Sequence, residues 1–238
     1  MFKYILNMFD LSVFKNQATG KAETTKLSIL ETALGLFRQK GFDATTMRDI
    51  ASAGNMAVGT AYHHFESKET IVAAYYQLVQ QTHAAQVQIF NTQKQTLKAK
   101  LEQSFLSKLE IVQHDQKLLG VIMRYIGDAE HPLSIFGENT ADLRQAGIEM
   151  YQTIFASENL SQELRDLVPT AFWALHMGML LYFLHDSSGG AKTRKLVGSA
   201  LELALGVLKL TNQPLVQPLL KPVFKKINLL LREHQLMR

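Results

Sequence analysis

The chain has 238 residues, 47% of them hydrophobic, which is enough apolar material for one large or two modest domains. It contains no cysteine, so disulfides and thiolate metal sites are excluded, as is usual in a reducing cytoplasm. The formal net charge is only +4, and a surplus this small does not by itself indicate a nucleic-acid partner.

The first segment, residues 1–22, is expected to be an untidy leader that is disordered in part. It is apolar but interrupted by Lys3, Asn7, Asp10 and Lys15. It also lacks a small-residue cleavage site, so we do not predict a signal peptide.

Two helices and a turn are predicted next. Leucine and phenylalanine recur every three or four residues over 24–40, which indicates an amphipathic helix. Thr46 and Asp49 have the spacing of a capping box that opens the second helix. Asn55 stands in the following turn, where it can adopt a positive φ more readily than most residues. A short helix over 58–64 then follows.

The remainder of the chain also has a helical pattern, with no convincing strand or internal repeat. Ser67 is expected to cap a long helix that runs to about residue 90. Apolar residues at a period of 3.6 predict five further helices, over residues 95–113, 116–127, 138–157, 168–185 and 191–210. The most apolar stretch, residues 171–184, is too short to cross a bilayer, so we predict no membrane span.

The C-terminal segment is rich in proline and in basic residues. Pro214, Pro218 and Pro222 are four apart, which predicts an extended or kinked chain over 212–222 and a last basic amphipathic helix over 223–236. Residues 209–238 carry a net charge of +5. We expect this tail to pack on the larger domain, although contact with DNA phosphates or a membrane surface is an alternative.

Residues 29–68 resemble the N-terminal domain of the TetR family of bacterial transcriptional regulators. The resemblance is specific because residues match in order and spacing over a stretch of about forty positions, whereas the rest of the chain matches only in length and helical pattern. The matching residues are Ile29, Leu30, Ala33, Leu36, Phe37, Gly41, Phe42, Thr45, Thr46, Asp49, Ile50, Ala51, Gly59, Thr60, Tyr62, Phe65, Ser67, Lys68 and Glu69.

The resemblance implies an all-α protein. Its N-terminal three-helix DNA-binding domain would contain a helix-turn-helix, and its larger C-terminal helical domain would bind a ligand and form a dimer. The expected division is a leader over 1–22, a DNA-binding domain over 23–70, an effector-binding and dimerisation domain over 71–211, and a basic extension over 212–238.

By the same resemblance, a set of polar side chains would contact DNA, mostly at phosphates. We add Val58, which can pack on a thymine methyl group in the major groove. The chain departs from the family pattern at Asn55, where glycine is usual, and at Ala57, where a serine hydroxyl usually caps the helix. The expected DNA-binding residues are Thr46, Val58, Thr60, Tyr62, His63, His64 and Lys68.

Two sets of residues are candidates for the larger domain's functions. An apolar cavity for an effector would be lined by Phe105, Met123, Arg124, Phe136, Trp173, His176 and Phe183. Its ligand is expected to be largely apolar, and anionic if Arg124 faces inward. A four-helix dimer interface would use Ala171, Ala174, Gly178, Leu201, Ala204, Leu205 and Leu208, because small residues allow close helix approach.

Our reading is a cytoplasmic, homodimeric, ligand-responsive regulator that binds a palindromic DNA operator, with repression as the first choice over activation. No cofactor, metal or enzymatic activity is expected. One alternative is an enzyme on a helical bundle that uses His176 or the loop with Asp128, Glu130 and His131. Another is a structural DNA-binding protein without an effector. Adjacent His63 and His64 do not favour a metal, because neighbouring helix residues point about 100° apart.

Overall fold

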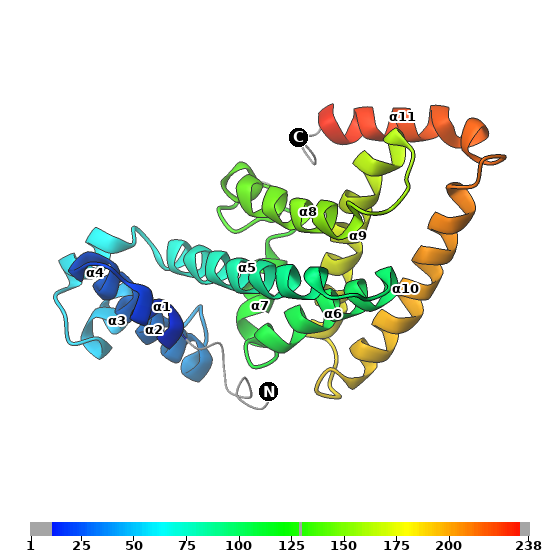
Figure 1. Cartoon of the computed structure of the whole chain (residues 1–238). Coiled ribbons are helices and arrows are strands. Elements are labelled where there is room, and N and C mark those ends of the chain that lie inside the picture. The colour runs from blue at the N-terminus through cyan, green and yellow to red at the C-terminus, as the bar shows by residue number, and fades with distance from the viewer. Residues whose placement is uncertain (1–10, 129, 234–238) are drawn as a thin grey trace. The chain divides into compact units, whose positions relative to one another are not determined.

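The computed structural model describes residues 11–128 and 130–233, and within these ranges the chain is helical with no strand (Figure 1). The predicted all-α fold is confirmed. The elements are α1 (Ser12–Gln17), α2 (Lys21–Lys40), α3 (Met47–Ala53), α4 (Val58–His64), α5 (Lys68–Thr92), α6 (Leu97–Val112), α7 (Gln116–Arg124), the 3-10 turn η1 (Glu138–Thr140), α8 (Ala141–Phe155), α9 (Gln162–Leu184), α10 (Ala191–Thr211) and α11 (Gln217–Glu233).

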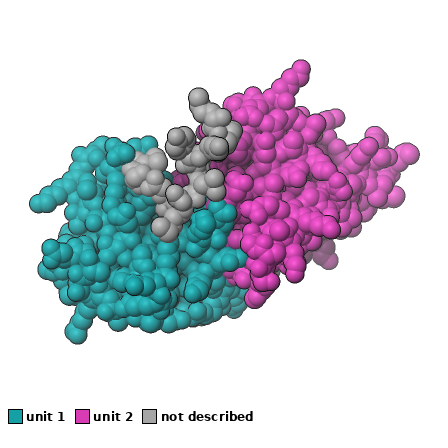
Figure 2. Space-filling model, turned by 90° about the horizontal axis from the view of Figure 1, so that it is seen from below, with its two compact units in different colours: residues 1–79, 111–140 teal, residues 80–110, 141–238 magenta. Residues whose placement is uncertain are grey.

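The helices form two compact units, coloured separately in Figure 2. The first unit comprises residues up to 79 and residues 111–140, and the second comprises residues 80–110 and 141 onward. Helix α5 therefore contributes residues to both units. The segment 111–140, which contains α7, joins the unit that holds α2 to α4 rather than the expected effector domain. The division of the chain by function stays a prediction.

The N-terminal leader is more ordered than the sequence suggested. Residues 1–10 lie outside the described part of the chain, but α1 follows and packs on α2. Leu11 is buried before α1 begins, and the Lys15 ammonium pairs with the Glu31 carboxylate of α2. Residues 11–22 therefore include a packed helix that the sequence analysis did not predict.

The prediction of an extended or kinked chain over 212–222 is wrong for residues 217–222, because α11 already begins at Gln217, whereas residues 212–216 are a non-helical turn. Pro218 lies in the first turn, where its missing N–H would have had no helical partner in any case. Pro222 lies inside the helix, as Pro169 does inside α9, which begins earlier than predicted. Helix α11 packs on α9, so the expectation that the tail packs on the larger part of the chain holds.

Three polar contacts attach α11 to the start of α9. The Asn228 side-chain amide donates to the Glu163 carbonyl oxygen at 3.0 Å, the Lys221 ammonium lies 3.3 Å from the Glu163 carboxylate, and the Arg232 guanidinium lies 3.2 Å from that of Asp166. Among the described residues, α9 is also the one helix long and apolar enough to span a bilayer, but half of its most apolar window is buried inside the protein.

The core of the first unit is organised around one buried carboxylate. Asp115, just before α7, is 2% exposed and accepts two hydrogen bonds from the Arg38 guanidinium of α2, at 2.6 and 2.9 Å. The Tyr75 hydroxyl of α5 donates a third, at 2.5 Å. Burial raises the pKa of Tyr75 well above its usual value, so the hydroxyl keeps its proton. Asp115 therefore joins three helices through charge-assisted bonds.

We expect Asp115→Ala to lower the free energy of unfolding by about 3–5 kcal/mol, because it leaves the partly buried Arg38 cation without its partner. Urea unfolding measures the loss. The control is Asp43→Ala, which removes the exposed pair of Asp43 with Arg124 and should cost at most about 1 kcal/mol. Equal losses for the two variants would contradict a central role for Asp115.

Candidate nucleic-acid interface

The predicted capping box at the start of α3 is confirmed. The Thr46 hydroxyl accepts from the Asp49 N–H at 3.1 Å, and the Asp49 carboxylate accepts from the Thr46 N–H at 2.8 Å. Hydrogen bonds from Lys40, at 2.8 Å, and from Thr46 lower the pKa of Asp49. Thr46 itself is exposed at the start of a helix, so a DNA phosphate can approach this helix N-terminus, although the Thr46 N–H is already bonded to Asp49.

The turn between α3 and α4 has the predicted conformation. Asn55 adopts φ +49°, and it is the one non-glycine residue with a positive φ in the described chain. The Met56 N–H donates to the Ala51 carbonyl oxygen at 2.9 Å and closes the turn. This local chemistry fixes the direction in which α4 leaves α3.

Helix α4, Val58–His64, has one inward and one outward face. Ala61 is fully buried, and its small side chain lets the helix lie close to α3. Val58 and Tyr62, one turn apart, are 38% and 50% exposed. An apolar side chain left uncovered on so short a helix suits contact with base edges in the major groove. We call α4 the reading helix.

The remaining expected DNA-contacting side chains of α4 differ in exposure. His63 is exposed, while Thr60 and His64 are half-buried. The rings of His63 and His64 lie edge to face, 5.3 Å apart. Ala57, the N-cap of α4, makes no side-chain hydrogen bond. The first turn of α4 therefore has unpaired backbone N–H groups that can donate to an anion.

Lys68 at the start of α5 is already engaged inside the protein. Its ammonium donates to the carbonyl oxygens of Phe42, Asp43 and Thr45 at 2.8, 3.3 and 3.2 Å. It also lies 4.3 Å from the centre of the Phe42 ring. All three ammonium protons have acceptors, so the side chain ties α5 to the loop after α2. A phosphate would meet the helix N-terminus rather than a free cation.

The comparisons with known proteins agree with this geometry. Residues 29–75 match the model of the family described as "Bacterial regulatory proteins, tetR family". The N-terminal domain belongs to the TetR family.

Curated relatives match over the same region. The transcriptional repressor KstR2 of Mycobacterium tuberculosis is 39% identical over 57 residues, which cover 24% of this chain and 28% of that protein. IcaR of Staphylococcus aureus, the negative regulator of the biofilm operon, is 44% identical over 46 residues, 19% of this chain and 25% of that protein. The chain thus matches about a quarter of the length of these relatives.

Solved structures share the fold over a larger part of the chain. FadR of Thermus thermophilus, a TetR-family repressor in complex with lauroyl-CoA, aligns with a TM-score of 0.61 at 19% identity, covering 76% of this chain and 93% of that one. A TetR-family regulator of Pectobacterium atrosepticum gives 0.62 at 17% identity, covering 80% and 97%. About a quarter of this chain lies outside the first alignment and a fifth outside the second.

The expected effector residues do not gather in one unit. Met123, Arg124 and Phe136 belong to the first unit, and the other candidates belong to the second. The Arg124 guanidinium is exposed and lies 3.0 Å from the Asp43 carboxylate, so Arg124 does not line an interior cavity, and the condition set for an anionic ligand is not met by this residue. Phe136 is 43% exposed. Of the seven, the residues buried in the second unit are Phe105, Trp173, His176 and Phe183.

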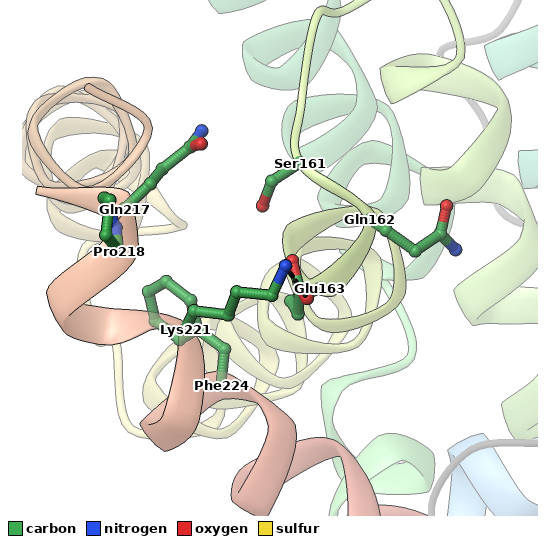
Figure 3. Close-up of a pocket in the computed structure, with 7 residues that line it drawn as sticks. All are labelled: Ser161, Gln162, Glu163, Gln217, Pro218, Lys221 and Phe224. Atoms are coloured by element: carbon green, nitrogen blue, oxygen red, sulfur yellow. Dashed lines mark ion pairs between the residues drawn. The ribbon is translucent and has the colours of Figure 1, made fainter. Parts of the chain in front are cut away.

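One cavity of about 440 Å³ lies between the start of α9 and α11 (Figure 3). Lys221 reaches from α11 toward Glu163, and their ion pair borders the cavity. None of the expected effector residues lines it. The sequence analysis missed it because it depends on α11, whose start was placed too late. The lining residues are Ser161, Gln162, Glu163, Gln217, Pro218, Lys221 and Phe224.

The expected dimer residues separate by exposure. Ala171, Ala174 and Gly178 lie on an exposed strip of α9, and Leu181 and Tyr182 extend that strip. Leu201 of α10 is instead fully buried in its own unit, so placing it at a dimer surface is wrong. Ala204, Leu205 and Leu208 are half-buried. The exposed apolar side chains of α10 are Leu203, Val207 and Leu210.

The loop that suggested an enzyme has ordinary turn contacts. The Asp128 carboxylate accepts from the Glu130 N–H at 3.2 Å. His131 accepts at Nδ1 from the Leu133 N–H, and its ring stacks on that of Tyr125. Across the described ranges, no three His, Asp or Glu side chains are placed to hold a metal ion. Asp128 and His131 thus have structural partners within the loop and on Tyr125.

We expect Ala57→Ser to raise the free energy of unfolding by about 1 kcal/mol, because the hydroxyl would accept from an unpaired N–H of α4. Thermal unfolding without DNA measures the gain. The control is Ala53→Ser at the end of α3, which adds the same hydroxyl where no cap is needed. An equal effect of both variants would rule out capping as the cause.

We expect Lys68→Met to lower the free energy of unfolding by about 1.5–3 kcal/mol through loss of bonds from the ammonium to the carbonyls. Tyr62→Ala, on the exposed face of the reading helix, should change it by no more than about 0.5 kcal/mol. Chemical denaturation of both variants tests this. If Lys68→Met unfolds like the wild type, the ammonium does not hold the loop and is available to DNA.

Proposed function

We propose that the protein is a ligand-responsive transcriptional repressor that binds a DNA operator as a homodimer in the cytoplasm. The observation that carries the proposal is the reading helix, a short helix in a TetR-family domain that leaves Val58, Tyr62 and His63 uncovered. The two curated relatives above are named as transcriptional repressors or negative regulators. Their match to this domain supports repression as the sign of regulation.

The expected DNA contacts divide into two kinds. Backbone N–H groups at the starts of α3, α4 and α5 suit phosphates and would set the register of the domain on DNA. Val58, Tyr62 and His63 face outward from α4 and would read base edges. Lys68 acts by holding α5 in place.

A homodimer is supported by the uncovered apolar surface of the second unit. Ala171, Ala174 and Gly178 on α9 let a partner helix approach closely, and α10 exposes Leu203 and Val207. A two-fold dimer would present two reading helices to half-sites about one DNA turn apart, roughly 34–36 Å. The operator would then be palindromic.

The ligand response follows from linkage. An effector bound in the second unit releases the operator only if it binds the DNA-free state more tightly than the DNA-bound state. The solved TetR-family repressor of Thermus thermophilus is in complex with lauroyl-CoA, a ligand that joins an apolar acyl chain to an anionic carrier. The aromatic interior of the second unit suits a largely apolar effector here.

Selection of binding sites from a random duplex DNA pool tests the proposal. We expect a palindromic sequence, and we expect the double variant Tyr62→Ala with His63→Ala to bind it about tenfold or more weakly. The thermal stability of the variant should match that of the wild type, because both side chains are exposed. No enriched sequence at low salt, or equal binding by the variant, would overturn the proposal.

A further inference from the structure

The second unit buries a lysine with no acidic partner. Lys108 of α6 is 5% exposed, and its ammonium donates to the Gln80 side-chain oxygen of α5 at 2.9 Å. Within the described part of the chain, no carboxylate lies within ion-pair distance of this nitrogen. Burying a lone cation is costly, and buried charges in proteins are normally paired or ligand-bound.

Burial lowers the pKa of the Lys108 ammonium to about 7. The folded chain therefore binds fewer protons than the unfolded chain between about pH 7 and the ordinary lysine range near 10.5. The buried charge of Lys108 therefore destabilises the folded chain fully below about pH 7, and this destabilisation lessens as the pH rises toward 10.5. The site thus disfavours the charged form of Lys108 unless an anion binds beside it.

Two further donors of the same cluster have no acceptor. The Nε2 atom of His176 and the side-chain nitrogen of Gln80 are buried without a hydrogen-bond partner. The Tyr151 hydroxyl, whose pKa burial raises, lies 2.6 Å from His176 Nδ1. Either tautomer of His176 fits this contact; in the one where the Tyr151 hydroxyl donates to Nδ1, the neutral ring carries its proton on the unpaired Nε2, and this is the tautomer that the proposal below uses. Unsatisfied buried donors are rare in native proteins and call for an explanation.

The walls of the cluster are aromatic. The Phe105 ring stacks on that of His176 with centres 4.4 Å apart, and His83 meets His176 edge to face at 5.5 Å. Tyr151 then continues the aromatic contacts to Phe172. Three hydrogen-bond donors enclosed by aromatic side chains suit a ligand with an apolar body and a small anionic end.

We propose that Lys108, Gln80 and His176 form the head-group site for an apolar effector that ends in a carboxylate. A carboxylate has two oxygens and up to four acceptor positions, so it satisfies the ammonium, the amide and the imidazole N–H together. The role of this ligand as an effector rests on the proposed function. Its binding to the protein can be measured without DNA.

The first experiment measures binding to the full-length protein with decanoate and dodecanoate as probes, and with decanol and dodecanol as uncharged controls. We expect the carboxylates to raise the Tm in proportion to the logarithm of their concentration, and the alcohols to bind far more weakly. Equal binding of acid and alcohol, or no binding of either carboxylate, would overturn the proposal.

The Lys108→Met variant gives the decisive comparison. We expect it to bind the carboxylates about 30-fold or more weakly, as expected when one partner of a buried charged pair is removed. At pH 6 and without ligand its Tm should be at or above that of the wild type, because the unpaired cation is gone. A structural lysine would give the reverse, namely a lower Tm with unchanged carboxylate binding.

The matched control is Lys98→Met, also on α6, where the lysine is exposed and pairs with Glu202. It should bind the carboxylates as the wild type does. Loss of binding in this variant too would show that net charge, rather than the head-group site, drives the interaction.

The pH dependence separates Lys108 from its titratable neighbours. Burial holds the pKa values of His83 and His176 low, with Lys108 lowering them further, and burial raises that of Tyr151, so these groups stay neutral from pH 7 to 9. Wild-type affinity should then fall about tenfold per pH unit above 7, while Lys108→Met shows no slope. A slope retained in the variant would overturn the assignment.

Adding the carboxylates to the protein on its selected operator distinguishes the two proposals. Carboxylate binding without any operator would refute the proposed repressor function and leave the head-group site standing. Selection of an operator without any carboxylate binding would refute the head-group site and leave the proposed repressor function standing.

Discussion

The buried Asp115 carboxylate is the interaction on which the first unit depends. It gathers Arg38 from α2 and Tyr75 from α5 at the start of α7, so three segments far apart in sequence share one centre. Around this fixed point the loop and turns between α2 and α5 can be short and locally determined. The reading helix is therefore carried on a scaffold whose geometry does not rely on the side chains that would face DNA.

The DNA-binding domain was predictable because its signals are local. The Thr46–Asp49 capping box and the positive φ at Asn55 are written in adjacent residues, and both occur as predicted. Helix α4 also has the predicted bounds. A signal of this kind depends on the local backbone and does not depend on contacts with the rest of the chain.

The failures involve contacts over long sequence separations. No residue near Arg124 in the sequence indicates that it pairs with Asp43. Because its sequence neighbours are apolar, Arg124 was a plausible residue of an internal pocket. Lys108 was overlooked because a single lysine in an amphipathic helix is normally exposed, and only the packing shows that it is buried. The proline-spaced tail was assigned by backbone preference alone, whereas packing against α9 accounts for a helix there.

The engagement of Lys68 within the loop has a consequence for the search of DNA. Residues 21–70 carry equal numbers of basic and acidic side chains, and Lys68 is committed to internal carbonyls. A domain of this kind releases few counterions on binding random DNA, so its non-specific affinity is weak. Fewer copies would be held on the many competing genomic sites, and a small number of molecules per cell would suffice to occupy one operator.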